Sequence, residues 1–261
     1  MSEADEGAPG RGLGPVDPSA GERRRFERWA AQGGRIGEPQ PAVPAATVIV
    51  LRDTADGLET LMLRRASKLS FAGGLWVFPG GRVDDADREG LEPDDTHGAA
   101  RRAAVREAAE EADLTVDPDS LVTLAHWEPP PQTPKRFATW FFLAPAPSGA
   151  VTVDGGEITD HTWARPGEVL ERRDAGEVEL APPTWVTLHG LAAHADVAGA
   201  LADAAANEPE HFTTRAALSA EGGVVAMWHG DAGYESGDAT ASGPRHRLWM
   251  LDSGWRYERT R

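Results

Sequence analysis

Three glutamates on one face of a predicted helix are the residues of this chain best suited to do chemistry. Glu107, Glu110 and Glu111 stand at positions i, i+3 and i+4, so their carboxylates project from the same side of a helix. Like charges at this spacing repel one another. A divalent cation such as Mg²⁺ or Mn²⁺ removes the conflict and keeps coordination positions open for substrate phosphates. The spacing therefore predicts a metal site suited to phosphate chemistry.

A turn with two glycines, Phe78-Pro79-Gly80-Gly81, comes before this helix in the chain. Because glycine has no side chain, the backbone N–H groups of such a turn can approach an anion closely. The competing interpretation of the helix is a solvated acidic face, in which Arg102 and Arg106 are ordinary i, i+4 partners of nearby acids.

Taken in order, these residues resemble the signature of the Nudix hydrolases. That signature runs Gly, five residues, Glu, seven residues, then Arg-Glu-apolar-x-Glu-Glu-x-Gly-apolar. Gly81 matches its first Gly, and residues 106–114 match its second half. Asp113 stands where the signature has its late Gly, at a helix end where Asp is a tolerable left-handed cap.

The chain departs from the signature upstream of Arg106. The stretch 82–105 is longer than the signature allows, which implies an insertion. The upstream Glu falls on Gly98 when it is counted back from Arg106 and on Asp87 when it is counted forward from Gly81, so neither count reaches a Glu.

The resemblance implies that Glu107, Glu110 and Glu111 are metal ligands, and that Arg106 orients a carboxylate through a bidentate hydrogen bond. Nudix enzymes often place a further metal-binding or basic carboxylate in a later loop, and Glu157 fits that place. The alternatives for that role are Asp154 and Asp160, or a Glu157 that is merely solvated. The five residues expected to be catalytic are Arg106, Glu107, Glu110, Glu111 and Glu157.

The segment 65–81 is similar to a motif that precedes the signature in coenzyme A diphosphatases, with Ser70 in place of its second Arg. The insertion and Lys135-Arg136-Phe137 also resemble the acyl-CoA branch. The residues that this implies for substrate binding are Arg65, Gly80, Gly81 and Arg136. The possible substrates are coenzyme A, acyl-CoA and other nucleoside diphosphate derivatives. For Arg136, the alternative to substrate binding is a structural role as a charged residue at the end of a strand.

Composition narrows the class of protein. The chain has 261 residues, 40% of them hydrophobic, which is enough for a core, and a net charge of −16. Such acidity argues against a nucleic-acid partner and leaves a small phosphorylated substrate as the expected one. The chain has no cysteine and no long apolar run, so we expect a cytoplasmic protein without a membrane span. Its oligomeric state stays open, with a homodimer as one option.

The order of predicted elements indicates an α/β fold. We expect a Nudix-type α/β/α sandwich with a mixed sheet at 41–206, a mostly disordered tail at 1–40, and a Trp-rich β extension at 207–261 packed on the main domain. The expected strands are 45–52, 59–65, 75–78, 121–128, 136–144 and 157–164. The expected helices are 20–32 in the tail, 96–112 capped by Thr96, 166–170 and 184–206. The extension is expected to form a hairpin of 223–230 and 245–257.

The sequence also contains two weaker patterns, and it allows two other functional classes of protein. Residues 85–90 loosely copy the start of an EF-hand loop, but Thr96 stands where a bidentate Glu is needed, so a solvated loop is preferred. The second pattern is a group of polar residues near the C-terminus, and its spacing in the sequence is not that of a metal site: His229, Asp231 and His246. The other classes are a catalytically inactive Nudix-like ligand-binding module and an acidic interaction protein. The intact glutamates favour the metal-dependent hydrolase of a diphosphate linkage.

Overall fold

The computed structural model describes residues 41–68, 72–131, 133, 135–251 and 253–260. The helix expected at 20–32, the predicted tail and Ser70 lie outside these residues. Within them, no helix has both the length and the apolar character needed to cross a membrane.

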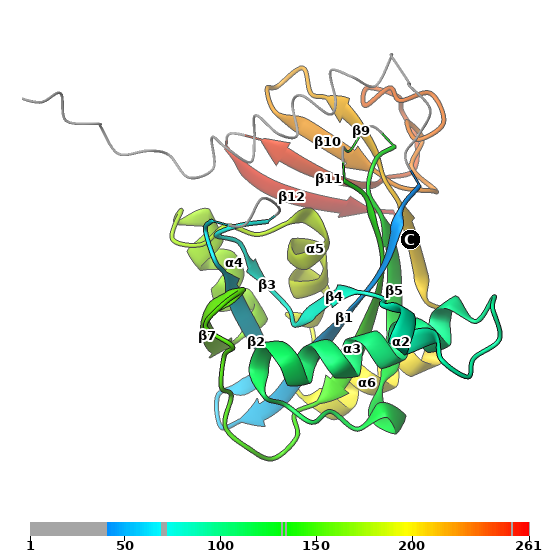
Figure 1. Cartoon of the computed structure of the whole chain (residues 1–261). Helices are drawn as coiled ribbons and strands as arrows, with labels where there is room; N and C mark the ends of the chain where they lie inside the picture. The colour runs from blue at the N-terminus through cyan, green and yellow to red at the C-terminus, as the bar shows by residue number, and fades with distance from the viewer. Residues whose placement is uncertain (1–40, 69–71, 132, 134, 252, 261) are drawn as a thin grey trace, which may run out of the picture.

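A mixed sheet of eight strands forms the centre of the fold (Figure 1). Its order is β3-β2-β1-β6-β5-β8, with β4 paired to β1 and β7 paired to β2. The strands are β1 (Val43–Thr54), β2 (Gly57–Arg65), β3 (Trp76–Val77), β4 (Gly80–Arg82), β5 (Val122–Glu128), β6 (Phe137–Pro145), β7 (Ile158–Ala164) and β8 (Glu210–Thr213). The apolar strand expected at 136–144 is β6, which lies between β1 and β5 as a central strand should.

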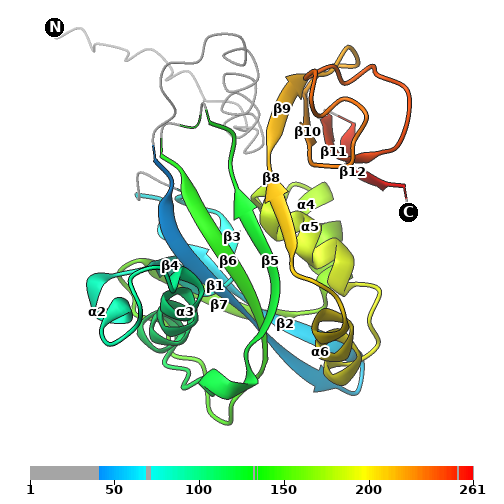
Figure 2. The same cartoon turned by 90° about the vertical axis from the view of Figure 1, so that its right-hand side faces the viewer.

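Helices cover both faces of this sheet, with α2 and α3 on one side and α4, α5 and α6 on the other (Figure 2). The helices are α2 (Asp85–Arg88), α3 (Thr96–Ala112), α4 (Pro166–Asp174), α5 (Pro182–Leu191) and α6 (Val197–Ala206), with a 3₁₀ turn η1 (Pro118–Ser120). Successive residues of β1 enter opposite cores: Val48 and Val50 pack toward α3, and Ile49 and Leu51 pack toward the other layer. The predicted α/β/α sandwich is confirmed.

Helix α3 packs tightly on the sheet because its inner face is built from alanines. Ala100, Ala104 and Ala108 are fully buried there. The predicted helix is correct, but its cap is Asp95, not Thr96, because the Asp95 side chain accepts a hydrogen bond from the Gly98 N–H at 2.7 Å. Asp113 ends the helix in the left-handed conformation.

The prediction of one helix over 184–206 is wrong, because α5 and α6 are separate helices. Asp196 begins α6 by accepting a hydrogen bond from the Gly199 N–H at 2.7 Å. In addition, the Val197 N–H donates to the Asp53 side chain at 2.9 Å, which ties this start to the end of β1. The two carboxylates satisfy backbone donors that a continuous helix would have used internally.

The C-terminal residues form more than a hairpin. A second, antiparallel sheet has the order β12-β11-β10-β9, from β9 (Arg215–Leu218), β10 (Val224–Met227), β11 (His246–Leu251) and β12 (Gly254–Arg259). Figure 1 shows it at one end of the main sheet. It shares a core with that sheet: Trp127 of β5 stacks on Phe212 of β8 with ring centroids 3.7 Å apart, and Trp228 packs edge-on against both.

Candidate functional site

The two glycines of the turn each lie close against a neighbouring group. Strand β4 pairs with β1 so that Gly80 lies opposite Thr47 and Gly81 opposite Ala46. A Cβ at Gly80 would collide with the backbone of β1, and a Cβ at Gly81 would overlap the carboxylate of Glu107. The absence of side chains therefore lets β4 lie directly against the acidic face of α3.

Glu111 is the most deeply placed carboxylate of that face. Its side chain is 7% exposed, and its Oε2 accepts a hydrogen bond from the Gly80 N–H at 2.9 Å. Burial raises the pKa of Glu111 to about 8, since desolvation, aided by Glu107 and Glu157, outweighs the Gly80 N–H and Arg65. A carboxyl group that is this costly to ionise is suited to hold a cation, whose charge would offset the cost.

Arg106 joins the acidic insertion to the helix. Its Nε and one terminal nitrogen, Nη2, donate to the two oxygens of Asp87 at 3.2 and 2.9 Å, which is the bidentate geometry expected of an orienting arginine. Burial alone would raise the pKa of Asp87, but the hydrogen bonds from Arg106 and from the Asp84 backbone hold it below its usual range. Asp87 is itself buried.

The ion pair between Arg106 and Asp87 shows that the prediction of a solvated loop in the insertion is wrong. Residues 85–88 form α2, and Asp87 faces Arg106, so they do not form a calcium loop. Asp87 is a site residue that sequence reasoning missed. The sequence did contain a signal for it, because the spacing of the Nudix signature, counted forward from Gly81, reaches Asp87.

The same arginine also bonds two of the predicted ligands. Its other terminal nitrogen, Nη1, donates to Glu107 at 2.9 Å and to Glu110 at 3.0 Å. The Glu110 side chain is 59% exposed. Burial raises the pKa of Glu107, and Arg106 opposes that rise. The predicted i, i+4 contact between Arg106 and Glu110 therefore exists within a larger network.

Glu157 reaches the site from a distant part of the chain. Its side chain is 63% exposed and accepts a hydrogen bond from Arg65 at 3.1 Å; the same guanidinium lies 3.5 Å from Glu111. Asp154 holds this loop, because its carboxylate accepts hydrogen bonds from the N–H groups of Gly156, Glu157 and Ile158. Asp154 thus holds the backbone on which Glu157 stands, and it lines the same cavity. Asp160 accepts from the His161 N–H instead.

A cavity of about 830 Å³ adjoins these side chains. The four glutamates, which we call the carboxylate cluster, all line it: Glu107, Glu110, Glu111 and Glu157. Arg65, Gly80, Gly81 and Arg106 line it as well. The structure therefore brings together eight of the nine residues predicted to act in catalysis or binding.

Arg136 is the exception. It lies just before β6, with its side chain close to Glu128 at 3.7 Å and donating to the Pro129 carbonyl at 3.4 Å. Its neighbours Lys135 and Phe137 line the cavity, whereas Arg136 is not among the lining residues. These contacts are those of the alternative role, a charge that fastens the strand end.

The donor set of the carboxylate cluster suits a hard divalent cation. All four donors are carboxylate oxygens, and Glu111 carries the desolvation cost that a cation would relieve. In the described part of the chain, no three acidic or histidine side chains converge closely enough as they stand to enclose a metal ion. Arg65 and Arg106 pair with these carboxylates instead.

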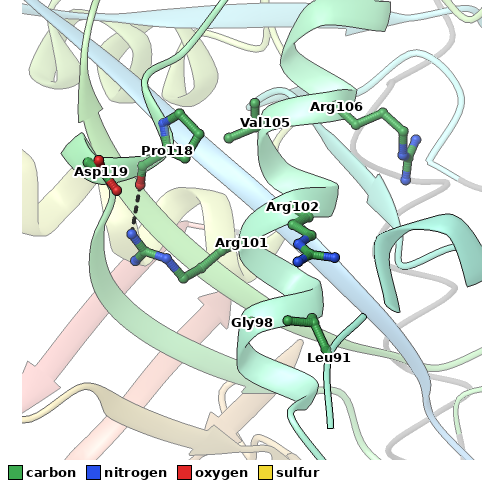
Figure 3. Close-up of a pocket in the computed structure, with 8 residues that line it drawn as sticks. All are labelled: Leu91, Gly98, Arg101, Arg102, Val105, Arg106, Pro118 and Asp119. Atoms are coloured by element: carbon green, nitrogen blue, oxygen red, sulfur yellow. Dashed lines mark hydrogen bonds between the residues drawn. The ribbon is translucent and has the colours of Figure 1, made fainter. Parts of the chain in front are cut away.

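A second, smaller pocket of about 450 Å³ lies on the outer side of α3 (Figure 3). Arg101 points toward Pro118 and donates to its carbonyl at 2.7 Å, and Arg102 donates to the Glu89 carbonyl at 2.5 Å. These arginines fasten neighbouring loops to the helix. In the competing interpretation of a solvated acidic face, Arg102 would pair with nearby acids, whereas its hydrogen bond here goes to a backbone carbonyl.

The histidine cluster near the C-terminus has a structural role. Asp231 and Arg247 form a fully buried ion pair at 2.5 Å, and the His246 N–H donates to the same carboxylate at 2.9 Å. Burial alone would raise the pKa of Asp231, but the hydrogen bonds from Arg247 and two backbone N–H groups lower it. These contacts join β11 to the loop after β10.

Comparisons with known proteins agree with this geometry. The NUDIX domain family matches residues 41–183, more than half of the chain. The chain therefore belongs to the Nudix family. The match covers the whole carboxylate cluster and ends before α6 and the C-terminal sheet.

Two known proteins are similar to part of the chain. The first, named "Putative nudix hydrolase 7", is from Caenorhabditis elegans; it is 27% identical over 175 residues, and the match covers 53% of this chain and 57% of the relative. The second is the crystal structure of a NUDIX hydrolase from Alicyclobacillus acidocaldarius. It has a TM-score of 0.57 and 26% identity, and the match covers 62% of this chain and 96% of that one.

Proposed function

We propose that this protein is a metal-dependent hydrolase that cleaves the diphosphate linkage of a nucleoside-diphosphate-linked small molecule. One observation carries the proposal: four carboxylates from two distant segments meet beside the Gly80-Gly81 turn at one cavity. Glu107, Glu110, Glu111 and Glu157 would hold Mg²⁺ or Mn²⁺. Such an ion neutralises the oxygens of a diphosphate and lowers the pKa of a bound water.

The protein's own residues supply positioning and charge. The Gly80 N–H and the buried face of α3 fix Glu111 in place. The Arg106 guanidinium donates hydrogen bonds to Glu107 and Glu110. It also donates to Asp87, which fixes the position of the guanidinium. Each carboxylate is therefore oriented before a substrate arrives, which reduces the reorganisation that catalysis would otherwise require.

Glu157 is our choice for the base that accepts a proton from the attacking water. It is the most exposed of the four carboxylates, so water reaches it readily. The loop that carries it is held by Asp154, and its carboxylate is held by Arg65. Arg65 also lines the cavity, where its positive charge favours the phosphate groups of a substrate.

Coenzyme A and its acyl derivatives are the substrates we propose first. The residues from Arg65 to Gly81 are similar to the motif of coenzyme A diphosphatases, and Arg65 lies at the carboxylate cluster. Other nucleoside diphosphate derivatives are the competing substrates.

The test is product release from coenzyme A, acyl-CoA, ADP-ribose, NADH, diadenosine polyphosphates and nucleoside triphosphates, with Mg²⁺, Mn²⁺ or chelator. We expect metal-dependent release of 3′,5′-ADP from coenzyme A, and a loss of about 10³-fold or more in Glu111→Gln. Glu59→Gln is the matched control, because Glu59 pairs with Arg52 outside the cavity lining. Turnover that survives Glu111→Gln would refute the mechanism. No cleavage of any compound would favour a ligand-binding module.

A further inference from the structure

The cavity at the carboxylate cluster has a second wall, part of which lies beyond the residues that the family match includes. Ala216 of β9, Ala226 of β10 and Met250 of β11 all line it, and all three belong to the C-terminal sheet. Trp127 and Phe141 of the main sheet line it too. We call these five residues the apolar wall.

The apolar wall is suited to a flexible hydrocarbon chain more than to a flat ring. Trp127 is only 3% exposed, and one face of its indole stacks on Phe212 with the ring planes 2° apart. Phe141 is also buried. Neither ring thus presents an open face on which a nucleobase could stack. Of the aliphatic members of the wall, Ala216 is half-buried, whereas Ala226 and Met250 are buried, and the flexible Met250 side chain can adjust to an aliphatic group.

The start of α5 adds to this apolar character. Pro182 and Pro183 both line the cavity at that helix terminus. Proline has no backbone N–H, so this terminus lacks two of the donors with which a helix start usually binds an anion. Phosphate groups are therefore better placed at the carboxylate cluster, and the remainder of a substrate toward the apolar wall.

One polar atom near the apolar wall has no partner. The indole N–H of Trp127 is buried and has no hydrogen-bond acceptor among the described residues. An unsatisfied buried donor is costly, but this nitrogen is enclosed by the protein, so the preference of the cavity for a ligand rests on its aliphatic lining.

We propose that the C-terminal sheet completes the substrate cavity and forms a subsite for the acyl chain of the diphosphate substrate. This rests on the proposed function for the cleaved linkage, and it adds what the rest of the substrate is. The part of the chain beyond residue 206 then selects the substrate, while the Nudix domain performs the reaction.

Ala216 and Ala217 provide a matched pair of variants for the test. Successive residues of a strand point to opposite faces, and only Ala216 lines the cavity and packs on the shared core. Ala216→Leu adds three carbons to the apolar wall. Ala217→Leu adds the same volume to the other face of β9.

Binding is measured first with neutral 1-alkanols from butanol to decanol, through tryptophan fluorescence, so that no turnover is needed. We expect affinity to rise up to about fourfold per methylene in the unmodified protein. In Ala216→Leu the rise should end about two to three methylenes earlier, and Ala217→Leu should behave as the unmodified protein. Affinity that does not depend on chain length, or the same change in both variants, would overturn the proposal.

Turnover is then compared for coenzyme A, butyryl-CoA and octanoyl-CoA. The ratio of kcat/KM for octanoyl-CoA to that for coenzyme A should exceed one in the unmodified protein and fall at least tenfold in Ala216→Leu only. An unchanged ratio in Ala216→Leu would overturn the proposal. Chain-dependent alkanol binding without any turnover would instead refute the proposed function and leave the subsite standing. The unmodified protein alone tests chain-length dependence if Ala216→Leu fails to fold.

Discussion

The buried carboxylate of Glu111 should make the metal-free protein less stable as the pH rises, and Glu111→Gln should remove that loss. Glutamine keeps the shape of the carboxyl group and can still accept the hydrogen bond from the Gly80 N–H. It cannot ionise, so it never carries the charge that burial opposes. The variant therefore separates the cost of ionisation from the packing of the side chain.

The size of the effect follows from the pKa of Glu111. Burial raises it from 4.5 to about 8 in the folded protein. The folded state then binds more protons than the unfolded state between these values, so stability is fully present below about pH 4.5 and is lost as the pH rises toward 8. From pH 5 to pH 7 the wild-type protein should lose about 2.5 kcal/mol relative to Glu111→Gln.

The assay is urea unfolding at pH 5 and pH 7 in the presence of a chelator, followed by tryptophan fluorescence. All other groups titrate in both proteins, so the change in their stability difference between the two pH values isolates Glu111. Glu110→Gln is the control for replacing a carboxylate of the same cluster at a largely exposed position. A difference between wild type and Glu111→Gln that is the same at both pH values would show that the ionisation of Glu111 carries no such cost.

Three more substitutions test the surrounding structure. Gly81→Ala should lower kcat about 10- to 100-fold with little change in unfolding free energy, because the added Cβ displaces only the flexible end of Glu107; equal activity in a steady-state assay would contradict this. Arg106→Lys should lower both activity and stability, the latter by about 2 kcal/mol, because lysine cannot bond both oxygens of buried Asp87; a melting curve that matches the wild type would argue against the pair. Asp231→Asn should cost about 3–5 kcal/mol in urea unfolding, because it leaves a buried arginine without a counter-charge, and a loss below 1 kcal/mol would show that the pair is dispensable.

Local patterns in the sequence were enough to predict the main elements. Continuous apolar runs located β1 and β6, and an alanine-rich stretch located α3, because strands buried on both faces and helices packed on a sheet require such residues. Helix ends were predicted less well. The break between α5 and α6 depends partly on a hydrogen bond from Val197 to Asp53, two residues that are far apart in the chain.

The C-terminal sheet shows why pairing partners are harder to predict than strands. The two Trp-rich segments were expected to form a hairpin, and β10 and β11 do pair. Strands β9 and β12 were not expected as separate edges of a sheet, since short strands of mixed polarity have no strong pattern of their own. Their position depends on the core that they share with the main sheet.

The sequence by itself determined which residues form the acidic face of α3 and that a glycine turn precedes it, since helical periodicity is a local property. Only the tertiary structure decided what lies opposite that face. Arg65 meets Glu157 across 92 positions of the chain, and Asp87 folds back onto Arg106 through α2. The apolar wall likewise requires the C-terminal sheet to dock beside β5. Such contacts result from burying apolar surface between distant segments, and the spacing within any one segment does not encode them.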